Sequence, residues 1–366
     1  MKKEIIILLF ILPLVFLYVF SHKIDFSKKK PHRYVVIEDS FEILEGQETK
    51  DWHYIQTQQD YQDLAYYKEL YERNYKHQFN CNLTFKIPTV VHLIWLGPKP
   101  FPIDSVNNIR SWIAHHPDWT FKFWTDRHYS PPCNGMEVHL LDDFVFQFLK
   151  TQFKESSNWK EKSDMWLYEI LYQEGGMCID HKFSCIKPFH GLHTGYDFYA
   201  ALNAPHEEID SLALSVGIEI LGAKAQHPIF LAAINNILER WDRKTKKFCT
   251  PISSTQVRLG MYRTFIAMTL ALKEGLNHPE NTDIIFPASY FYAKRSLPGF
   301  YTQRPMSTFW DRSHKNFTKR IFYNVLQNIK KQNAKIIHVE LLSMFAIIGS
   351  AFICYLIKKN NNKQSA

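Results

Sequence analysis

The stretch from Thr89 to Leu96 constrains the fold more than any other part of the sequence. These residues, TVVHLIWL, form an almost uninterrupted apolar and β-branched run that is closed by Gly97-Pro98. Such a run, with turn residues behind it, is typical of a strand buried on both faces of a sheet. The sequence therefore predicts a sheet whose two faces are covered by other elements.

Strand and helix patterns alternate after this run. A helix that Asp104 or Ser105 can cap is expected first, followed by a strand over 120–125 and a helix over 142–153. Two further helices are expected over 228–241 and 262–273. Alternation of this kind indicates an α/β fold with a parallel-rich sheet.

The segment from Ser163 to Asp180 carries the strongest candidate site. Its first part, 163–174, has a helical pattern, and Gly175-Gly176 supplies the left-handed conformation that ends a helix. Met177-Cys178-Ile179 then predicts a short strand with Asp180 at its end. In open α/β sheets, ligands bind at the carboxyl ends of strands, so Asp180 is a candidate ligand-binding residue.

The two ends of the chain carry apolar segments. Residues 5–20 follow Lys2-Lys3 and have no small-residue cleavage site behind them, and residues 341–357 end at Lys358-Lys359. We expect an integral membrane protein anchored at both ends. Basic residues flank both sides of each segment, so the positive-inside rule does not choose a side for the domain. The expected parts are an anchor over 1–22, a stem and helical segment over 23–85, an enzyme domain over 86–320 and a transmembrane helix over 336–357.

Charge and cysteine content exclude several other classes. The net charge is +8, but much of it lies in lysine clusters near the ends rather than in a basic stripe along the domain, so no nucleic-acid partner is expected. The six cysteines form no CxxC pair, which favours reduced thiols. No HExxH, GxSxG, P-loop or GxGxxG motif is present.

Three motifs in order resemble a known family. Ile87-Pro88 is followed by His92 and Trp95, a Ser-Asp pair opens the helix at 163–164, and Gly-Gly, a strand and Asp180 complete the set. Together they resemble the glycosyltransferase family with a DXD sugar-binding region, which includes OCH1-like mannosyltransferases. The chain is more distantly similar to the catalytic domain of clostridial glucosylating toxins. The resemblance is good over residues 86–190 and weak up to about 310.

The resemblance implies a GT-A, Rossmann-like fold and transfer of a sugar from a nucleotide-sugar donor with retention of configuration. It implies that Trp95 stacks on the donor base, that Asp164 bonds donor hydroxyls and that Asp180 is the first carboxylate of the DXD pair. Each has a structural alternative: Trp95 could close the core, and Asp164 could stabilise the helix dipole. Ser307–Trp310 matches the position of the family's closing loop, which makes Trp310 a candidate donor contact.

The sequence departs from the family pattern at two positions. The DXD triplet reads Asp180-His181-Lys182, and Leu167 stands where members carry an arginine. Three interpretations remain open. Asp180 could bind Mn²⁺ or Mg²⁺ with His181 or with a downstream ligand such as Glu219; the Lys182 ammonium could replace the metal; or the domain could bind donors without catalysis.

These features predict a membrane-tethered glycosyltransferase whose partners are a nucleotide-sugar donor, a glycan or lipid acceptor and the membrane itself. The alternative is a catalytically inactive, membrane-anchored protein that binds nucleotide sugars through a degenerate DXD motif. The identities of the sugar, the acceptor and the membrane do not follow from the residues.

Overall fold

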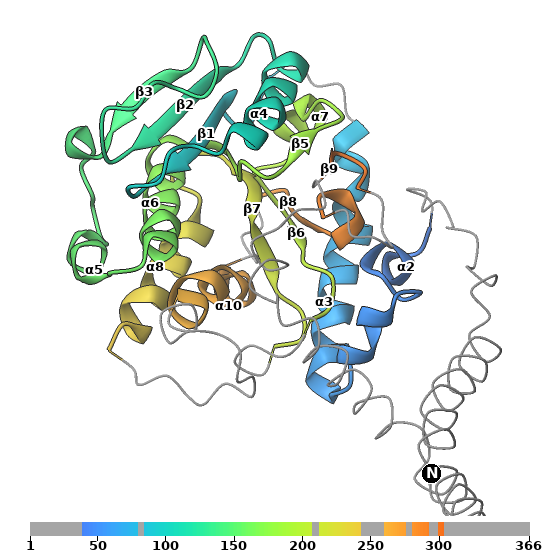
Figure 1. The fold of residues 1–366 in the computed structure, drawn as a ribbon. Coiled ribbons are helices and arrows are strands. Elements are labelled where there is room, and N and C mark those ends of the chain that lie inside the picture. The colour runs from blue at the N-terminus through green and yellow to red at the C-terminus, as the bar shows by residue number, and fades with distance from the viewer. Residues whose placement is uncertain are drawn as a thin grey trace, which may run out of the picture. The chain divides into compact units, whose positions relative to one another are not determined.

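The computed structural model describes residues 39–79, 84–206, 212–242, 260–275, 280–292 and 299–303. These residues form an α/β fold with a seven-stranded mixed sheet flanked by helices (Figure 1). Helix α8 packs against both α6 and α10 beside the sheet, and α4 and α7 lie on its other side (Figure 1). The predicted fold class, a mixed α/β sheet flanked by helices, is confirmed.

The strand order of the main sheet is β3-β2-β1-β4-β7-β6-β8. Pairing is parallel from β3 to β4, antiparallel between β4, β7 and β6, and parallel again between β6 and β8. A second, two-stranded sheet joins β5 and β9. The strands are β1 (Val90–Trp95), β2 (Thr120–Thr125), β3 (Glu137–Leu140), β4 (Gly176–Ile179), β5 (Ser184–Cys185), β6 (Phe198–Leu202), β7 (Val216–Ala223), β8 (Asp283–Phe286) and β9 (Thr302–Gln303).

The described helices lie between and around these strands. The α-helices are α2 (Phe41–Glu45), α3 (Gln58–Asn74), α4 (Ile103–His115), α5 (Lys150–Glu155), α6 (Trp159–Glu174), α7 (His190–Gly195), α8 (Pro228–Arg240) and α10 (Ile266–Gly275). Short 3₁₀ turns are η1 (Lys50–Tyr54), η2 (Tyr75–Phe79), η3 (Leu141–Asp143) and η5 (Ala288–Tyr290), and a π turn, η4 (Met261–Phe265), precedes α10.

Helices α2 and α3 belong to the same core as the sheet. Helix α3 lies beside β8 (Figure 1), and the buried hydroxyls of Tyr71 and Tyr290 are 2.8 Å apart. The buried carboxylate of Glu45, at the end of α2, accepts a hydrogen bond from the amide nitrogen of Ala288 at 2.8 Å. The helical segment before residue 86 therefore packs against the edge of the sheet.

Two glycines join α6 to β4 in the way the sequence predicts. Gly175 has φ +68° and Gly176 has φ +95°, a region that residues with a side chain rarely adopt. A Cβ atom on Gly176 would lie 2.6 Å from the carbonyl oxygen of Val90 on β1. The turn brings β4 against β1, and this pairing fixes the position of the residue that follows β4.

The structure corrects two local predictions. The helix expected over 142–153 is wrong: after the 3₁₀ turn the chain is extended at Phe144, and α5 begins only at Lys150. The cause is the buried Glu169, whose carboxylate accepts hydrogen bonds from the amide nitrogens of residues 147, 148 and 149. The helix cap predicted at Asp104 or Ser105 is also wrong, because α4 begins earlier with Pro102 at its N-cap.

The predicted membrane segments, over 1–22 and 336–357, lie outside the described residues. Within the part of the chain that is described, no helix combines the length and the apolar character needed to cross a membrane.

Candidate functional site

Asp180 follows directly after β4, where the sheet changes from parallel to antiparallel pairing. Its amide nitrogen donates to the carbonyl oxygen of Glu219 on β7 at 2.8 Å. Its carboxylate accepts from the amide nitrogen of Lys182 at 2.9 Å and lies 3.4 Å from the Lys182 ammonium. Burial alone would raise the pKa of Asp180, but the positive charges of Lys182, His181 and Lys160 outweigh burial and lower the pKa to about 2. Asp180 is therefore ionised at neutral pH.

Asp164 lies one turn into α6 and is almost fully buried. One carboxylate oxygen is 2.6 Å from the ammonium of Lys160, and the other accepts from the hydroxyl of Thr264 at 2.9 Å. Burial raises the pKa of Asp164, although Lys160 opposes the rise. Asp164 is thus held in one orientation by two elements, α6 and the turn before α10.

A small hollow of about 50 Å³ brings these residues together at the carboxyl end of β4. Asp164 and Asp180 both line it, together with His181 and Glu219. One carboxylate oxygen of Glu219 is buried and has no hydrogen-bond partner among the described residues. The other lining residues are Ile94, Lys160, Ser163, Leu167, Cys178, Ile179 and Ile218.

His181 is oriented by α4. Its Nδ1 lies 2.7 Å from the hydroxyl of Ser105, and its carbonyl oxygen accepts from the side-chain amide of Asn108 at 3.0 Å. Its Nε2 is 4.0 Å from the carboxylate of Asp180. Ser105, which was predicted to cap the helix, therefore contacts His181 in the loop after β4 instead of the helix end.

Trp95 is the last residue of β1 and is half-buried beside this loop. Its ring meets His181 edge-on, with centroids 5.1 Å apart, and contacts Phe101 at 5.3 Å. Its indole nitrogen donates to the carbonyl oxygen of Lys99 at 2.8 Å. Trp95 thus lies next to the hollow without lining it, and stacking on a donor base stays a prediction.

The remaining predicted residues differ in their placement. Lys182 lies beside Asp180, with about a third of its side chain exposed. Trp310 lies outside the described residues.

The residues at the hollow do not fit a divalent ion as they are arranged. Mg²⁺ and Mn²⁺ require several oxygen ligands. The oxygens of Asp164 bond Lys160 and Thr264, and the carboxylate of Asp180 faces Lys182. Among the residues that the structure describes, no group of three or more His, Cys, Asp or Glu side chains is arranged to hold a metal ion.

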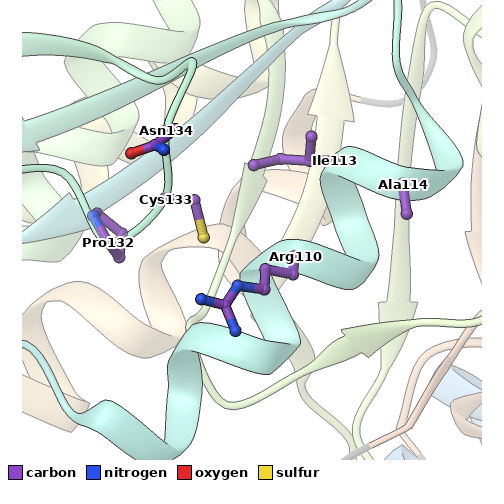
Figure 2. Close-up of a pocket in the computed structure, with 6 residues that line it drawn as sticks. All are labelled: Arg110, Ile113, Ala114, Pro132, Cys133 and Asn134. Carbon is purple, nitrogen blue, oxygen red and sulfur yellow. The ribbon is translucent and has the colours of Figure 1, made fainter.

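A second hollow lies on the outer side of α4. Figure 2 shows Cys133, from the loop 132–134, facing Arg110 and Ile113 of α4. Its thiol lies 3.8 Å from the carbonyl oxygen of Val106, and the Arg110 guanidinium donates to Asn107. None of the residues expected to bind a donor lines this second hollow.

Comparison with known proteins bears on the first hollow. Residues 102–199 match the family model described as "Glycosyltransferase sugar-binding region containing DXD motif". The matched range includes Asp164 and Asp180. The resemblance to a family of transferase enzymes, inferred from the sequence, is therefore confirmed.

Two curated proteins of Schizosaccharomyces pombe are similar to the chain. Inositol phosphoceramide mannosyltransferase 3 is 25% identical over 163 residues, which is 44% of this chain and 40% of that protein. Inositol phosphoceramide mannosyltransferase 1 is 26% identical over 168 residues, 45% of this chain and 47% of that protein. The similarity thus spans less than half the length of either relative.

Solved structures with similar folds are distant in sequence. The catalytic domain of alpha-toxin from Clostridium novyi is 10% identical, with a TM-score of 0.46, and the match covers 84% of this chain and 94% of that domain. The PaToxG glycosyltransferase is 13% identical, with a TM-score of 0.39, and the match covers 58% of this chain and 78% of that protein.

Lys160 and Thr264 hold Asp164, and neither was predicted from the sequence. Lys160 precedes Asp164 by four residues, a helical ion-pair spacing. That signal was hidden because the predicted helix began at 163, whereas Asn158 caps α6 by accepting from the amide nitrogen of Lys160 at 2.9 Å. Thr264 has no local signal, since it lies 100 residues along the chain.

Proposed function

We propose that the chain is a GT-A-type glycosyltransferase that transfers a sugar from a nucleotide-sugar donor to a glycan or lipid acceptor near a membrane, with retention of configuration. One observation carries the proposal: Asp164 and Asp180, from two different elements, line one hollow at the carboxyl end of β4, inside the range that matches the DXD family. Strand ends of this kind are where α/β folds bind ligands.

The residues have distinct roles in this proposal. Ionised Asp180 and buried Asp164 accept hydrogen bonds from donor hydroxyls, and the ring of Trp95 stacks on the donor base. The Lys182 ammonium neutralises the departing diphosphate as a point charge, since lysine can supply positive charge without metal ligands. The protein then acts mainly by positioning the two substrates and stabilising the leaving group.

The relatives suggest where to start with substrates. Both curated proteins are named as mannosyltransferases acting on inositol phosphoceramide. A mannosyl donor and an acceptor with an inositol phosphate headgroup are therefore the first pair to test, ahead of glucosyl donors and neutral lipids.

The test is hydrolysis or transfer with a panel of UDP- and GDP-sugars, with Mn²⁺ and with excess chelator. We expect turnover in chelator, and loss of turnover in Lys182→Ala but not in Lys187→Ala, because the Lys187 ammonium lies over the Phe300 ring instead of beside Asp180. Strict dependence on Mn²⁺ would contradict the role of Lys182. Donor binding without turnover under any condition would favour the alternative, an inactive nucleotide-sugar-binding protein.

A further inference from the structure

Lys160 holds an unusual place for a lysine. It is the second residue of α6, where the positive end of the helix dipole disfavours a cation, and it precedes its acidic partner, the less favourable order for a helical pair. Local helix energetics therefore do not explain the position of this side chain.

Three carboxylates from three elements line the hollow around this ammonium. Asp164 comes from α6, Asp180 follows β4 and Glu219 lies on β7, and all three line the hollow with Lys160. Ile179 pairs with Ile220 across the antiparallel strands, which places Asp180 opposite Glu219. Carboxylates placed so close together repel one another unless a cation lies among them.

Lys160 brings an ammonium to the same hollow. It carries three hydrogens, and the 2.6 Å contact to Asp164 uses one of them. Although partial desolvation opposes the shift, the negative charge of Asp164, and those of Glu219 and Asp180 beyond salt-bridge distance, raise the pKa of Lys160. The Lys182 ammonium, by contrast, lies beside Asp180 without lining the hollow.

We propose that Lys160 is the resident cation of the hollow: its ammonium takes the place among Asp164, Asp180 and Glu219 that a divalent ion would require. The charge of the Lys160 ammonium explains why the carboxylates of this hollow are not arranged to bind a divalent ion. Given the proposed function, on which this further step rests, the Lys160 ammonium contacts the donor diphosphate together with the Lys182 ammonium. More than half of the Lys160 side chain is exposed, so it can reach a bound ligand from its place.

The test is a titration of the protein with Mn²⁺ in the absence of nucleotide. Binding is measured from the electron paramagnetic resonance signal of the free Mn²⁺. Wild type is expected to bind no Mn²⁺ at this hollow at millimolar concentration. Lys160→Met removes the competing charge and is expected to bind at least tenfold more tightly than wild type, and adding Asp180→Asn to it is expected to abolish the gain. Lys162→Met, a lysine of the same helix that packs over the Trp159 ring instead, is expected to match wild type.

A second variant covers the case in which Lys160→Met does not fold. Lys160→Gln keeps a hydrogen-bond donor for Asp164 without a charge, and it is also expected to gain Mn²⁺ affinity, whereas Lys160→Arg is not. Tight Mn²⁺ binding by wild type that Asp180→Asn removes, or equal affinity in wild type and the neutral variants, would overturn the proposal. Failure of every nucleotide sugar to bind wild type would instead overturn the proposed function and leave the metal result standing.

Discussion

Asp180 and Glu219 face each other across the antiparallel pair β4 and β7, joined by a 2.8 Å hydrogen bond from the amide nitrogen of Asp180 to the carbonyl oxygen of Glu219. The bond is made by the backbone, so replacing either side chain leaves the strand pairing intact. Each carboxylate can therefore be tested for its chemistry separately from its contribution to folding.

The first prediction concerns Asp180→Asn. The change removes an ionised acceptor but keeps the size of the side chain, and hydrogen bonds to charged groups contribute about 1.5–3 kcal/mol. We expect the affinity for the nucleotide-sugar donor to fall roughly 10- to 100-fold, measured by calorimetric titration. Asp143→Asn, an exposed carboxylate in η3, is the control. Unchanged affinity in Asp180→Asn would remove this residue from the site.

The second prediction concerns the turn that places Asp180. Gly176→Ala puts a Cβ atom 2.6 Å from a backbone oxygen of β1, so the strand pairing must shift. Gly135 has a similar φ of +85°, but nothing lies within 4 Å of the place that a Cβ atom would take there, so Gly135→Ala is expected to cost only about 1–2 kcal/mol. Urea unfolding should show a clearly larger loss of stability for Gly176→Ala. Equal losses would mean that crowding at this turn is unimportant.

The third prediction concerns Glu169, whose carboxylate bonds three successive backbone nitrogens. In Glu169→Gln an amide group replaces one acceptor oxygen and faces these donors, so we expect a loss of about 2–4 kcal/mol in the free energy of unfolding. Glu174→Gln, which breaks a partly exposed pair with Lys122, should cost less than about 1 kcal/mol. Thermal and urea unfolding would measure both. A loss no greater in Glu169→Gln than in Glu174→Gln would contradict the assigned role.

The fourth prediction concerns pH. Burial lowers the pKa of His193 from 6.5 to about 3, and the positive charges of His116 and His190 lower it further. The folded state therefore binds this proton less readily than the unfolded state, and stability is lost as the pH falls below 6.5. We expect His193 to account for about 2 kcal/mol of the loss between pH 7 and pH 5. His193→Gln should be less stable at pH 7 but show a shallower pH dependence, whereas an unchanged slope would exclude His193 as its source.

Local patterns were enough to predict the centre of the sheet and the turn before Asp180. The strand over 120–125 agrees with β2, and β1 lies inside its predicted run, since apolar β-branched runs and a Gly-Gly stop carry their own structural meaning. The helix over 142–153 failed because Glu169, distant in sequence, bonds the backbone of that segment. The neighbours of Asp164 were missed for a related reason: Thr264 is placed by tertiary folding, and no spacing rule connects residues 100 positions apart.

The turn at Gly175-Gly176 also determines which substitutions the triplet Asp180-His181-Lys182 can accept. The path of the chain into Asp180 is set at Gly175 and Gly176, and the amide nitrogen of Lys182 bonds the Asp180 carboxylate whatever side chain residue 182 carries. Exchanging an acid for a base at the third place of the triplet therefore leaves the scaffold undisturbed. The charge of the loop over residues 180–182 can therefore change by substitution while the backbone of the loop keeps its conformation.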